Sequence, residues 1–438
     1  MKDGVHVAGI GGVGMSALAQ ALLDQGETVT GSDRLLDSGG MTDTLACLAA
    51  QGVKLFPQDG SGVTPQTARL VVSSAIEAGN PEMVRARGLG IPVVHRAEEL
   101  ARRVAGQRLI AVTGTCGKSS VTAMLGCLLA GAGFDPLVVN GAAVAGWGAC
   151  GTRIGSVRKG CGGWAVVEAD ESDKSLMVFR PEHAVITNAS ADHFGLDETL
   201  SLFASFRARI PGVVIDGRQE TGKPERLRLE GWSGFFTFEG VEYGVPLPGA
   251  HNVYNAWHAV RMAHALGAEP DKLAAALRGF SGVERRLQRV GTCGGAVVVD
   301  DYAHNPEKLA AAWTTLAAAF PAGVCAVWRP HGYAPLRKML DDLVTVFARV
   351  CRPADSLILL PVYDAGGTAD RSLGSAVLAS RLGEKGVTVT LIQTLAEAET
   401  LMRERAVPGG AVVTFGARDP GLPRLAARLA GVKVRGCL

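Results

Sequence analysis

The sequence predicts an α/β fold of three domains, and three observations lead to this prediction. The chain has 438 residues, which at roughly 150 residues per domain corresponds to about three domains. Short apolar stretches of strand length alternate with helical stretches, the pattern of doubly wound sheets with parallel strands. This alternation begins afresh at Val5, Leu109 and Ala296. The 57 glycines and the aromatic content of 5% suit tight strand–helix turns better than a β-sandwich.

Each domain is predicted from its own run of strands. In the first, a strand over 5–10 and a helix over 16–25 precede strands over 28–30 and 70–73. In the second, a strand over 109–113 leads through a glycine turn into a helix that ends near residue 130. Its further strands cover 164–168 and 183–187, and those of the third domain cover 296–300, 324–328, 356–361, 388–392 and 411–415. The predicted domains are 1–106, 107–285 and 286–438.

Composition excludes several classes of protein. The net charge of +2 gives no reason to expect binding to nucleic acid or to an anionic membrane surface. No uncharged apolar run reaches about 18 residues and no leader pattern precedes the first strand, so neither a membrane span nor a signal peptide is expected. The nine cysteines form no CxxC pair, which favours reduced thiols in a cytoplasmic protein. A monomer or a homodimer is expected.

A glycine-rich turn follows the first strand. It contains Gly11, Gly12 and Gly14, and Asp33 ends the next predicted strand. Such glycines let the backbone approach a diphosphate at a helix N-terminus, and an acidic residue in this place can bind a ribose hydroxyl. The pattern predicts a nucleotide site and leaves open whether the ligand is a dinucleotide or a UDP derivative.

The second domain begins with a phosphate-binding loop. Its sequence is Thr-Gly-Thr-Cys-Gly-Lys-Ser-Ser over 113–120, where Val112 occupies the place of the first glycine of the usual loop. Backbone N–H groups of such a turn bind phosphate oxygens, Lys118 can reach the terminal phosphates, and the Ser119 hydroxyl can bind Mg²⁺.

Carboxylates and a histidine follow later strands of this domain. Glu168, Asp170, Glu171 and Asp173 lie within six residues, and they repel one another unless a cation or water separates them. A solvated acidic loop is the alternative, but after a phosphate loop a magnesium site is the better interpretation. His193 stands beside Asp192 after another strand, which favours a metal or phosphate ligand over a structural histidine.

Three further groups are ambiguous on their own. Asn252 and Asn255 share a helix face and could bind an adenine edge or cap the helix. Arg285 and Arg286 precede the third domain and could sense a γ-phosphate or be solvated. The Asp-Asp-Tyr-Ala-His-Asn-Pro block over 300–306 is a strand end that leads into a helix with proline just inside its start.

Taken in this order, the blocks resemble the Mur ligase family of ATP-dependent amide-forming ligases of peptidoglycan synthesis, over the whole chain. The Gly-Ile-Gly-Gly-Val-Gly-Met-Ser block over 9–16, Gly-Ser-Asp over 31–33 and Glu-Ala-Asp-Glu-Ser-Asp over 168–173 are similar to the alanine-adding branch. The resemblance implies a Rossmann-like first domain for the UDP-sugar, a central P-loop ATPase domain, and a Rossmann-like C-terminal domain for the amino acid.

The resemblance also implies site residues, residue by residue. The UDP-sugar would be bound by Gly11, Gly12, Gly14, Met15, Ser16, Ser32, Asp33, Ser73 and Ser74. ATP would be bound by Gly114, Thr115, Gly117, Lys118, Ser119, Ser120, Asn252, Asn255, Arg285 and Asp301. Mg²⁺ would be held by Ser119, Glu168, Glu171 and His193, and the acceptor would lie near Tyr302, His304, His331 and Tyr333. The catalytic residues would be Lys118, His193 and Glu171.

The implied reaction joins an amine, with L-alanine the first expectation, to the lactyl carboxylate of UDP-N-acetylmuramate through an acyl phosphate, using ATP and Mg²⁺. Two departures stand out. Cys116 replaces a histidine of the family's loop, and Gly332 and Pro335 replace two arginines expected near the acceptor carboxylate. Arg329 or Arg337 could substitute, or the acceptor could be another amino acid or a peptide.

Two hypotheses from other classes fit the sequence less well than the ligase. A non-catalytic nucleotide-binding paralogue would be expected to have lost Lys118 or the carboxylates, and the chain keeps both. An NAD(P)-dependent oxidoreductase would use only the first glycine motif and would leave Lys118 and the acidic block without a role.

Overall fold

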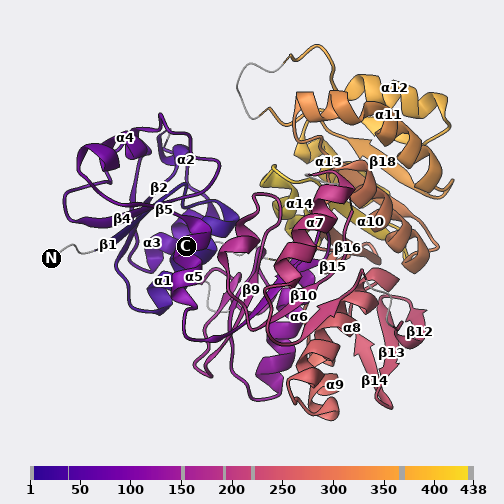
Figure 1. Ribbon diagram of the computed structural model, residues 1–438. Helices are drawn as coiled ribbons and strands as arrows, with labels where there is room; N and C mark the ends of the chain where they lie inside the picture. The colour runs from indigo at the N-terminus through magenta and orange to yellow at the C-terminus, as the bar shows by residue number, and fades with distance from the viewer. Residues whose placement is uncertain are drawn as a thin grey trace.

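The structure is a computed structural model that describes residues 4–37, 39–148, 153–190, 194–218, 222–364 and 370–432. The chain forms three lobes in chain order, with the first lobe beside the second and the third packed on the other side (Figure 1). Each lobe is organised around its own sheet. The predicted α/β fold class is confirmed.

The first sheet is parallel throughout, with helices on its two faces. In spatial order its strands are β3 (Lys54–Phe56), β2 (Val29–Ser32), β1 (Gly4–Ala8), β4 (Thr67–Val72) and β5 (Val93–His95). Its helices are α1 (Val13–Asp24), α2 (Arg34–Asp37), α3 (Asp43–Ala50), α4 (Pro81–Gly88) and α5 (Arg96–Arg103). Because β1 lies between β2 and β4, the glycine turn after β1 lies at the centre of the carboxyl edge.

The central sheet has β6, which leads into the phosphate loop, in its middle. Its strands in spatial order are β11 (Val214–Asp216), β10 (His183–Ile186), β6 (Arg108–Thr113), β9 (Trp164–Glu168), β7 (Leu137–Val139) and β8 (Val157–Arg158). The neighbours of β6 are β10 and β9, both parallel to it. The residues that follow these three strands therefore meet at one edge.

Helices and a small second sheet complete the central lobe. The helices are α6 (Lys118–Gly131), the 3₁₀ helix η1 (Ser175–Val178), α7 (Leu196–Arg207), α8 (Ala250–Ala265) and α9 (Pro270–Arg278). The second sheet is antiparallel and consists of β12 (Glu225–Glu230), β13 (Ser233–Phe238) and β14 (Val241–Val245). Packing of α8 and α9 against α6 places α8 beside the phosphate loop.

The third sheet is parallel except for its first strand. In spatial order its strands are β15 (Gln288–Cys293), β16 (Ala296–Asp301), β20 (Ala411–Phe415), β17 (Val324–Trp328), β18 (Ser356–Leu359) and β19 (Val389–Leu391). Its helices are α10 (Pro306–Ala319), α11 (Tyr333–Val350), α12 (Ser375–Glu384), α13 (Leu395–Glu404) and α14 (Gly421–Leu429). The last strand in chain order, β20, lies between β16 and β17.

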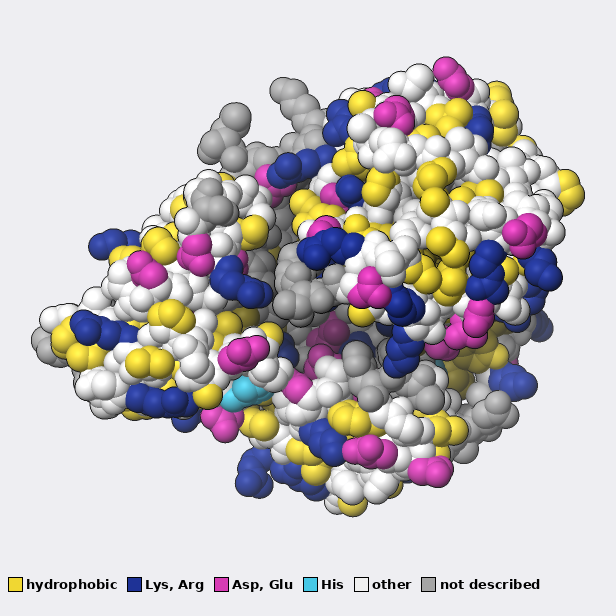
Figure 2. All heavy atoms as spheres, turned by 90° about the horizontal axis from the view of Figure 1, so that it is seen from above, with side chains coloured by type: hydrophobic (Ala, Val, Ile, Leu, Met, Phe, Trp, Pro, Cys, Tyr) yellow, Lys and Arg dark blue, Asp and Glu magenta, His cyan; other side chains and the backbone are white. Residues whose placement is uncertain are grey.

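Side chains connect the lobes. Arg153 of the second lobe binds Asp24 of α1 at 2.5 Å, and Arg424 of α14 contacts Asp43 of α3 at 3.2 Å. From above, a hollow lies beside the first lobe near the middle of the molecule, with charged side chains along its sides (Figure 2). Over the described ranges, none of the helices combines the length and the apolar character that crossing a bilayer requires.

Candidate active site

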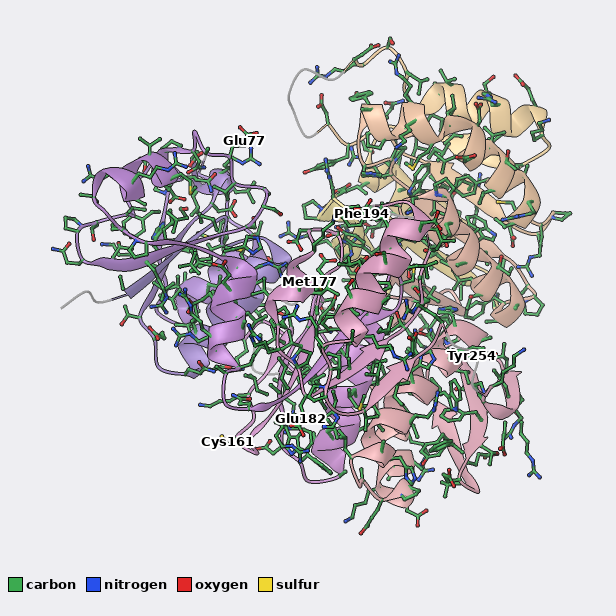
Figure 3. The ribbon with its side chains drawn as sticks, in the orientation of Figure 1. Glu77, Cys161, Met177, Glu182, Phe194 and Tyr254 are labelled. Carbon is green, nitrogen blue, oxygen red and sulfur yellow. The ribbon has the colours of Figure 1, made fainter. Side chains whose placement is uncertain are left out.

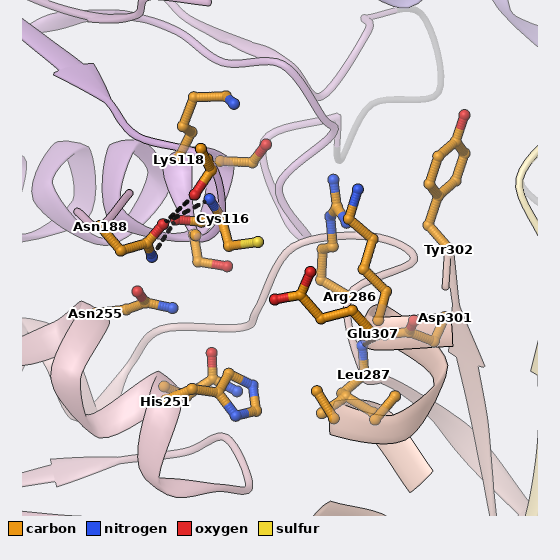
Figure 4. A pocket seen from close by; sticks show the side chains of 18 of the residues that line it. Cys116, Lys118, Asn188, His251, Asn255, Arg286, Leu287, Asp301, Tyr302 and Glu307 are labelled. Atoms are coloured by element: carbon orange, nitrogen blue, oxygen red, sulfur yellow. Dashed lines mark hydrogen bonds between the residues drawn. The ribbon is translucent and has the colours of Figure 1, made fainter. Parts of the chain in front are cut away.

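Two cavities lie at the carboxyl edges of the sheets. The larger, of about 700 Å³, lies between the phosphate loop of the second lobe and the third lobe. The smaller, of about 450 Å³, lies in the first lobe at the glycine turn. Figure 4 shows the larger cavity, with Lys118 and Cys116 on one side and Arg286, Tyr302 and Glu307 on the other.

The phosphate loop ends in the N-terminus of α6, which is suited to anions. The first turn of α6 carries no acidic residue, and its N-cap Gly117 has a φ of +84°. A side chain at Gly117 would be strained, and its Cβ would lie 2.6 Å from Asn255 Oδ1. Gly114, with a φ of +134°, is packed against Thr187. Both glycines are therefore required by the backbone path of the loop.

Asn188, two residues after the end of β10, holds this loop through its side chain. Its Oδ1 accepts from Thr115 Oγ1 at 2.7 Å and from Cys116 N at 2.9 Å, and its Nδ2 donates to Cys116 O at 2.9 Å. Thr187 Oγ1 also donates to Cys116 O, at 2.6 Å. The side chains of Asn188 and Thr187 bind the backbone of Cys116 and not its side chain. These hydrogen bonds therefore do not depend on whether residue 116 is cysteine or histidine.

Lys118 lies largely buried among carboxylates. Its Nζ donates to Gly114 O at 2.8 Å and to Glu171 Oε2 at 2.6 Å, and Asp170 Oδ1 is 3.8 Å away. Burial opposes the charge, but Glu171, Asp170 and Glu168 outweigh it and raise the pKa of Lys118. The ammonium therefore stays charged at neutral pH. An ATP phosphate that enters the loop would compete with Glu171 for it.

The donors available for Mg²⁺ are oxygen atoms beside the phosphate loop. Ser119, Glu168 and Glu171 all line the larger cavity. Within the described ranges no three acidic, histidine or cysteine side chains form a ready-made metal cage. Mg²⁺ beside a nucleotide takes one or two protein ligands together with phosphates and waters, so this oxygen set fits it. His193, the predicted fourth ligand, lies outside the described residues.

The third lobe forms the opposite wall. Asp301 lines the cavity and accepts from Leu287 N and Ala303 N, both at 2.7 Å. Burial raises the pKa of Asp301 to about 6, although these two N–H groups oppose the shift. Arg286, Tyr302 and Lys308 also line the cavity.

Arg285, predicted to bind ATP, does not line the cavity within the described structure, whereas Arg286 does. The Arg285 guanidinium is directed to Asp300 Oδ2 at 3.3 Å and to the carbonyl oxygens of Gly416 and Ala417. The physical reason is that Asp300 is almost fully buried and needs a charged partner. The sequence identified the arginine pair but not which member faces the cavity.

Helix α8 closes the cavity from below in Figure 4, where His251 and Asn255 are labelled. Asn252 and Asn255 both line the cavity, as their shared helix face predicts. Asn252 Nδ2 donates to Pro248 O at 2.8 Å and so also holds the start of α8. His251 lines the cavity as well, and burial lowers its pKa.

The smaller cavity contains about half of the residues predicted for the UDP-sugar. Gly12, Met15, Asp33 and Ser73 line it, together with Glu77, which is labelled at the top of the first lobe in Figure 3. Asp33 also fixes the glycine turn, because its Oδ2 accepts from Gly11 N at 3.0 Å.

The other predicted residues of this site do not line the cavity; they are Gly11, Gly14, Ser16, Ser32 and Ser74. Ser32 is fully buried, and Ser16 Oγ donates to Val13 O within α1. Gly14 is packed against the Arg96 guanidinium, which a Cβ would meet at 2.6 Å. Gly11, Gly14, Ser16 and Ser32 are packed around the turn, whereas Ser74 is exposed. The contact of all five with a ligand stays a prediction.

The predicted acceptor residues gather at the carboxyl edge of the third sheet. Tyr302 and His304 line the larger cavity, and the ring of His331 lies 5.0 Å from that of His304. Burial, with His304 and Arg418, lowers the pKa of His331 to about 4. Tyr333 begins α11 immediately afterwards.

The two arginines considered as substitutes near the acceptor are already paired. Arg329 binds Asp419 at 2.7 Å, and Arg337 binds Asp370 at 2.6 Å.

Comparison with known proteins decides the family. A profile described as "Mur ligase family, catalytic domain" matches residues 4–108, and one described as "Mur ligase, glutamate ligase domain" matches residues 285–418. The UDP-N-acetylmuramate–L-alanine ligase of Cereibacter sphaeroides is 35% identical over 455 residues, which cover 94% of this chain and 93% of that protein. The chain belongs to the Mur ligase family.

Further relatives of this Mur ligase agree along its whole length. The ligase of the same name from Ruegeria pomeroyi is 35% identical and covers 94% of both chains. The crystal structure of the UDP-N-acetylmuramate-alanine ligase of Thermotoga maritima superposes with a TM-score of 0.80 at 24% identity over 98% of each chain. A murein peptide ligase of Psychrobacter arcticus gives a TM-score of 0.64 at 19% identity, covering 99% of this chain and 100% of its own. The predicted family and three-lobe architecture are confirmed.

The sequence alone did not assign a ligand contact to four residues that line the cavity of this Mur ligase: Asn188, His251, Glu307 and Lys308. Asn188 had a signal, since it directly follows a strand that neighbours the phosphate-loop strand. Glu307 and Lys308 lie in the first turn of α10 and had none, because charged residues are common at exposed helix starts.

Proposed function

We propose that this Mur ligase joins a free amino acid, in the first place L-alanine, to the lactyl carboxylate of UDP-N-acetylmuramate with ATP, in peptidoglycan precursor synthesis. The observation that carries the proposal is the larger cavity, in which the phosphate loop faces the predicted acceptor residues Tyr302 and His304. The names of the full-length relatives support the substrate pair. In this proposal the smaller cavity, at Asp33, binds the UDP moiety.

The proposed reaction has two steps. A lactyl carboxylate oxygen attacks the γ-phosphorus, the bond to the bridging oxygen breaks, and ADP leaves. The neutral amine then attacks the acyl carbon, and inorganic phosphate leaves with its electron pair as the amide forms. Overall, carboxylate, ATP and ammonium give amide, ADP, hydrogen phosphate and one proton.

Residues of this chain have distinct roles in the proposal. Lys118 stabilises charge that develops on the transferred phosphoryl group, and Asn188 keeps the loop N–H groups in place for it. Ser119 with Glu171 or Glu168, and by prediction His193, would hold Mg²⁺. That ion supplies charge neutralisation at the phosphates. Arg286 and Lys308 add positive charge from the third lobe.

The test is an assay of ADP and phosphate release with UDP-N-acetylmuramate, MgATP and L-alanine, with the product identified by mass spectrometry. We expect turnover that depends on all three substrates. UDP-N-acetylglucosamine, which lacks the lactyl carboxylate, is the matched control and should give none. Turnover without the sugar nucleotide, or a product without the added amino acid, would contradict the proposal.

A further inference from the structure

The carboxyl edge of the third sheet brings three loops together in register. Asp301, the last residue of β16, pairs with Phe415 of β20, which pairs in turn with Trp328 of β17. Three residues beyond these strand ends lie His304, Arg418 and His331. Because β20 lies between β16 and β17, the loop that carries Arg418 starts between the loops that carry His304 and His331.

The loop that carries Arg418 is held on both sides. Arg285 donates to the carbonyl oxygens of Gly416 and Ala417, and Arg329 binds Asp419, whose Oδ1 also accepts from Gly421 N. Arg285 and Arg329, both considered as ligand-binding residues from the sequence, therefore hold this loop in place. A loop fixed in this way holds its remaining side chain ready for a ligand.

The N–H donors of the Arg418 guanidinium are available to a ligand. It is exposed, and over the described ranges it has neither an ion pair nor a side-chain hydrogen bond. Its charge acts on His331, which burial and His304 also keep neutral at pH 7. The N-terminus of the 18-residue helix α11, with no acidic residue in its first turn, begins two residues after His331.

The loops also leave β16, β20 and β17 in two directions. Helices α10 and α11, which follow β16 and β17, pack into one core, whereas α14, which follows β20, packs into the core on the other face. Such a divergence marks a topological switch point, and the carboxyl edge at a switch point is the usual place of ligands in sheets of this kind. His304, a member of this group, also lines the larger cavity.

We infer that Arg418, with His331, binds the α-carboxylate of the amine acceptor, so that the acceptor is a free α-amino acid rather than a peptide. This inference rests on the proposed function. It assigns to the loop after β20 the positive charge that Gly332 and Pro335 do not supply. An arginine binds a carboxylate through two parallel N–H donors, which orients the acceptor amine towards the acyl carbon.

The test compares Arg418→Ala and Arg418→Lys with the wild type, using L-alanine, L-alaninamide and a dipeptide as acceptors at saturating MgATP and UDP-N-acetylmuramate. Losing a charge-assisted contact should raise the KM for L-alanine about 10- to 100-fold. The KM for ATP should stay within about twofold, and lysine should restore part of the loss. Alaninamide should be a poor acceptor that the substitution weakens no further.

The matched control is Arg349→Ala, an exposed arginine in the last turn of α11, roughly 24 Å along the helix from its start. It should behave as the wild type. The inference would be overturned if Arg418→Ala left the KM for L-alanine unchanged, or if it reduced activity with alaninamide as much as with L-alanine. It would also be overturned if the KM for ATP rose equally, or if the wild type used the dipeptide as fast as L-alanine.

A separate reaction distinguishes this failure from that of the proposed function. Hydroxylamine traps an acyl phosphate as a hydroxamate without any amino acid. If the wild type forms hydroxamate from UDP-N-acetylmuramate and ATP, the proposed activation stands, whatever the outcome at Arg418. If it forms none and no acceptor gives turnover, the proposed function falls and this inference falls with it.

Discussion

Replacing Asn188 by alanine should disorder the phosphate loop while leaving the sheet beneath it intact. The substitution removes three hydrogen bonds, from Thr115 Oγ1, from Cys116 N and to Cys116 O. At a net value of about 1 kcal/mol each, they contribute about 3 kcal/mol. If all of this free energy holds the loop in its binding geometry, ATP affinity falls by at most roughly 100-fold.

The expected loss is smaller than this ceiling. Thr187 Oγ1 still donates to Cys116 O at 2.6 Å, and Thr115 N still donates to the backbone carbonyl of residue 188 at 3.4 Å. We therefore expect the KM for ATP to rise about 10- to 50-fold. The KM for UDP-N-acetylmuramate should hardly change, because the smaller cavity lies in another lobe.

The assay is phosphate release with ATP and UDP-N-acetylmuramate varied in turn, together with a denaturation curve. Thr394→Ala is the control, since it removes the N-cap of α13 at a cost of about 1 kcal/mol and lies outside both cavities. It should lower stability without changing the KM for ATP. If Asn188→Ala changed stability alone, or changed both KM values equally, the Asn188 side chain would not act through the phosphate loop.

Four further outcomes are expected. Lys118→Ala should abolish ATP-dependent phosphate release in a folded protein, and full residual activity would refute its role at the phosphates. Gly117→Ala should abolish ATP binding in equilibrium titrations, because of its φ of +84° and the contact with Asn255. Asp33→Ala should weaken UDP-sugar binding and spare ATP binding, and a collapse of ATP affinity instead would show that the lobes do not divide the substrates. His331, whose pKa is lowered to about 4, binds fewer protons folded than unfolded. It therefore stabilises the fold above pH 6.5 and loses this contribution as pH falls towards 4, so His331→Gln should flatten the loss of stability between pH 7 and 5 in urea titrations.

Residue periodicity predicted the central strands of the large sheets because these strands are buried on both faces and are therefore continuously apolar. The strands over 164–168, 324–328 and 411–415 were predicted with the bounds that the structure has. The small antiparallel sheet of β12, β13 and β14 was not predicted, since β12 is mostly exposed and carries charged residues rather than an apolar run. The phosphate loop was predicted because backbone geometry and phosphate chemistry require glycine, lysine and a hydroxyl at fixed spacing.

The direction of side chains was decided only by the tertiary structure. Arg285 and Arg286 are neighbours in sequence, yet one satisfies buried Asp300 and the other lines the cavity. Asn188 reaches the phosphate loop because β10 lies beside β6, and Arg418 joins His304 and His331 because β20 is inserted between strands that precede it by many residues. Sequence spacing records which groups follow which strand, whereas strand order determines which of those groups meet, and that order depends on packing over the whole sheet.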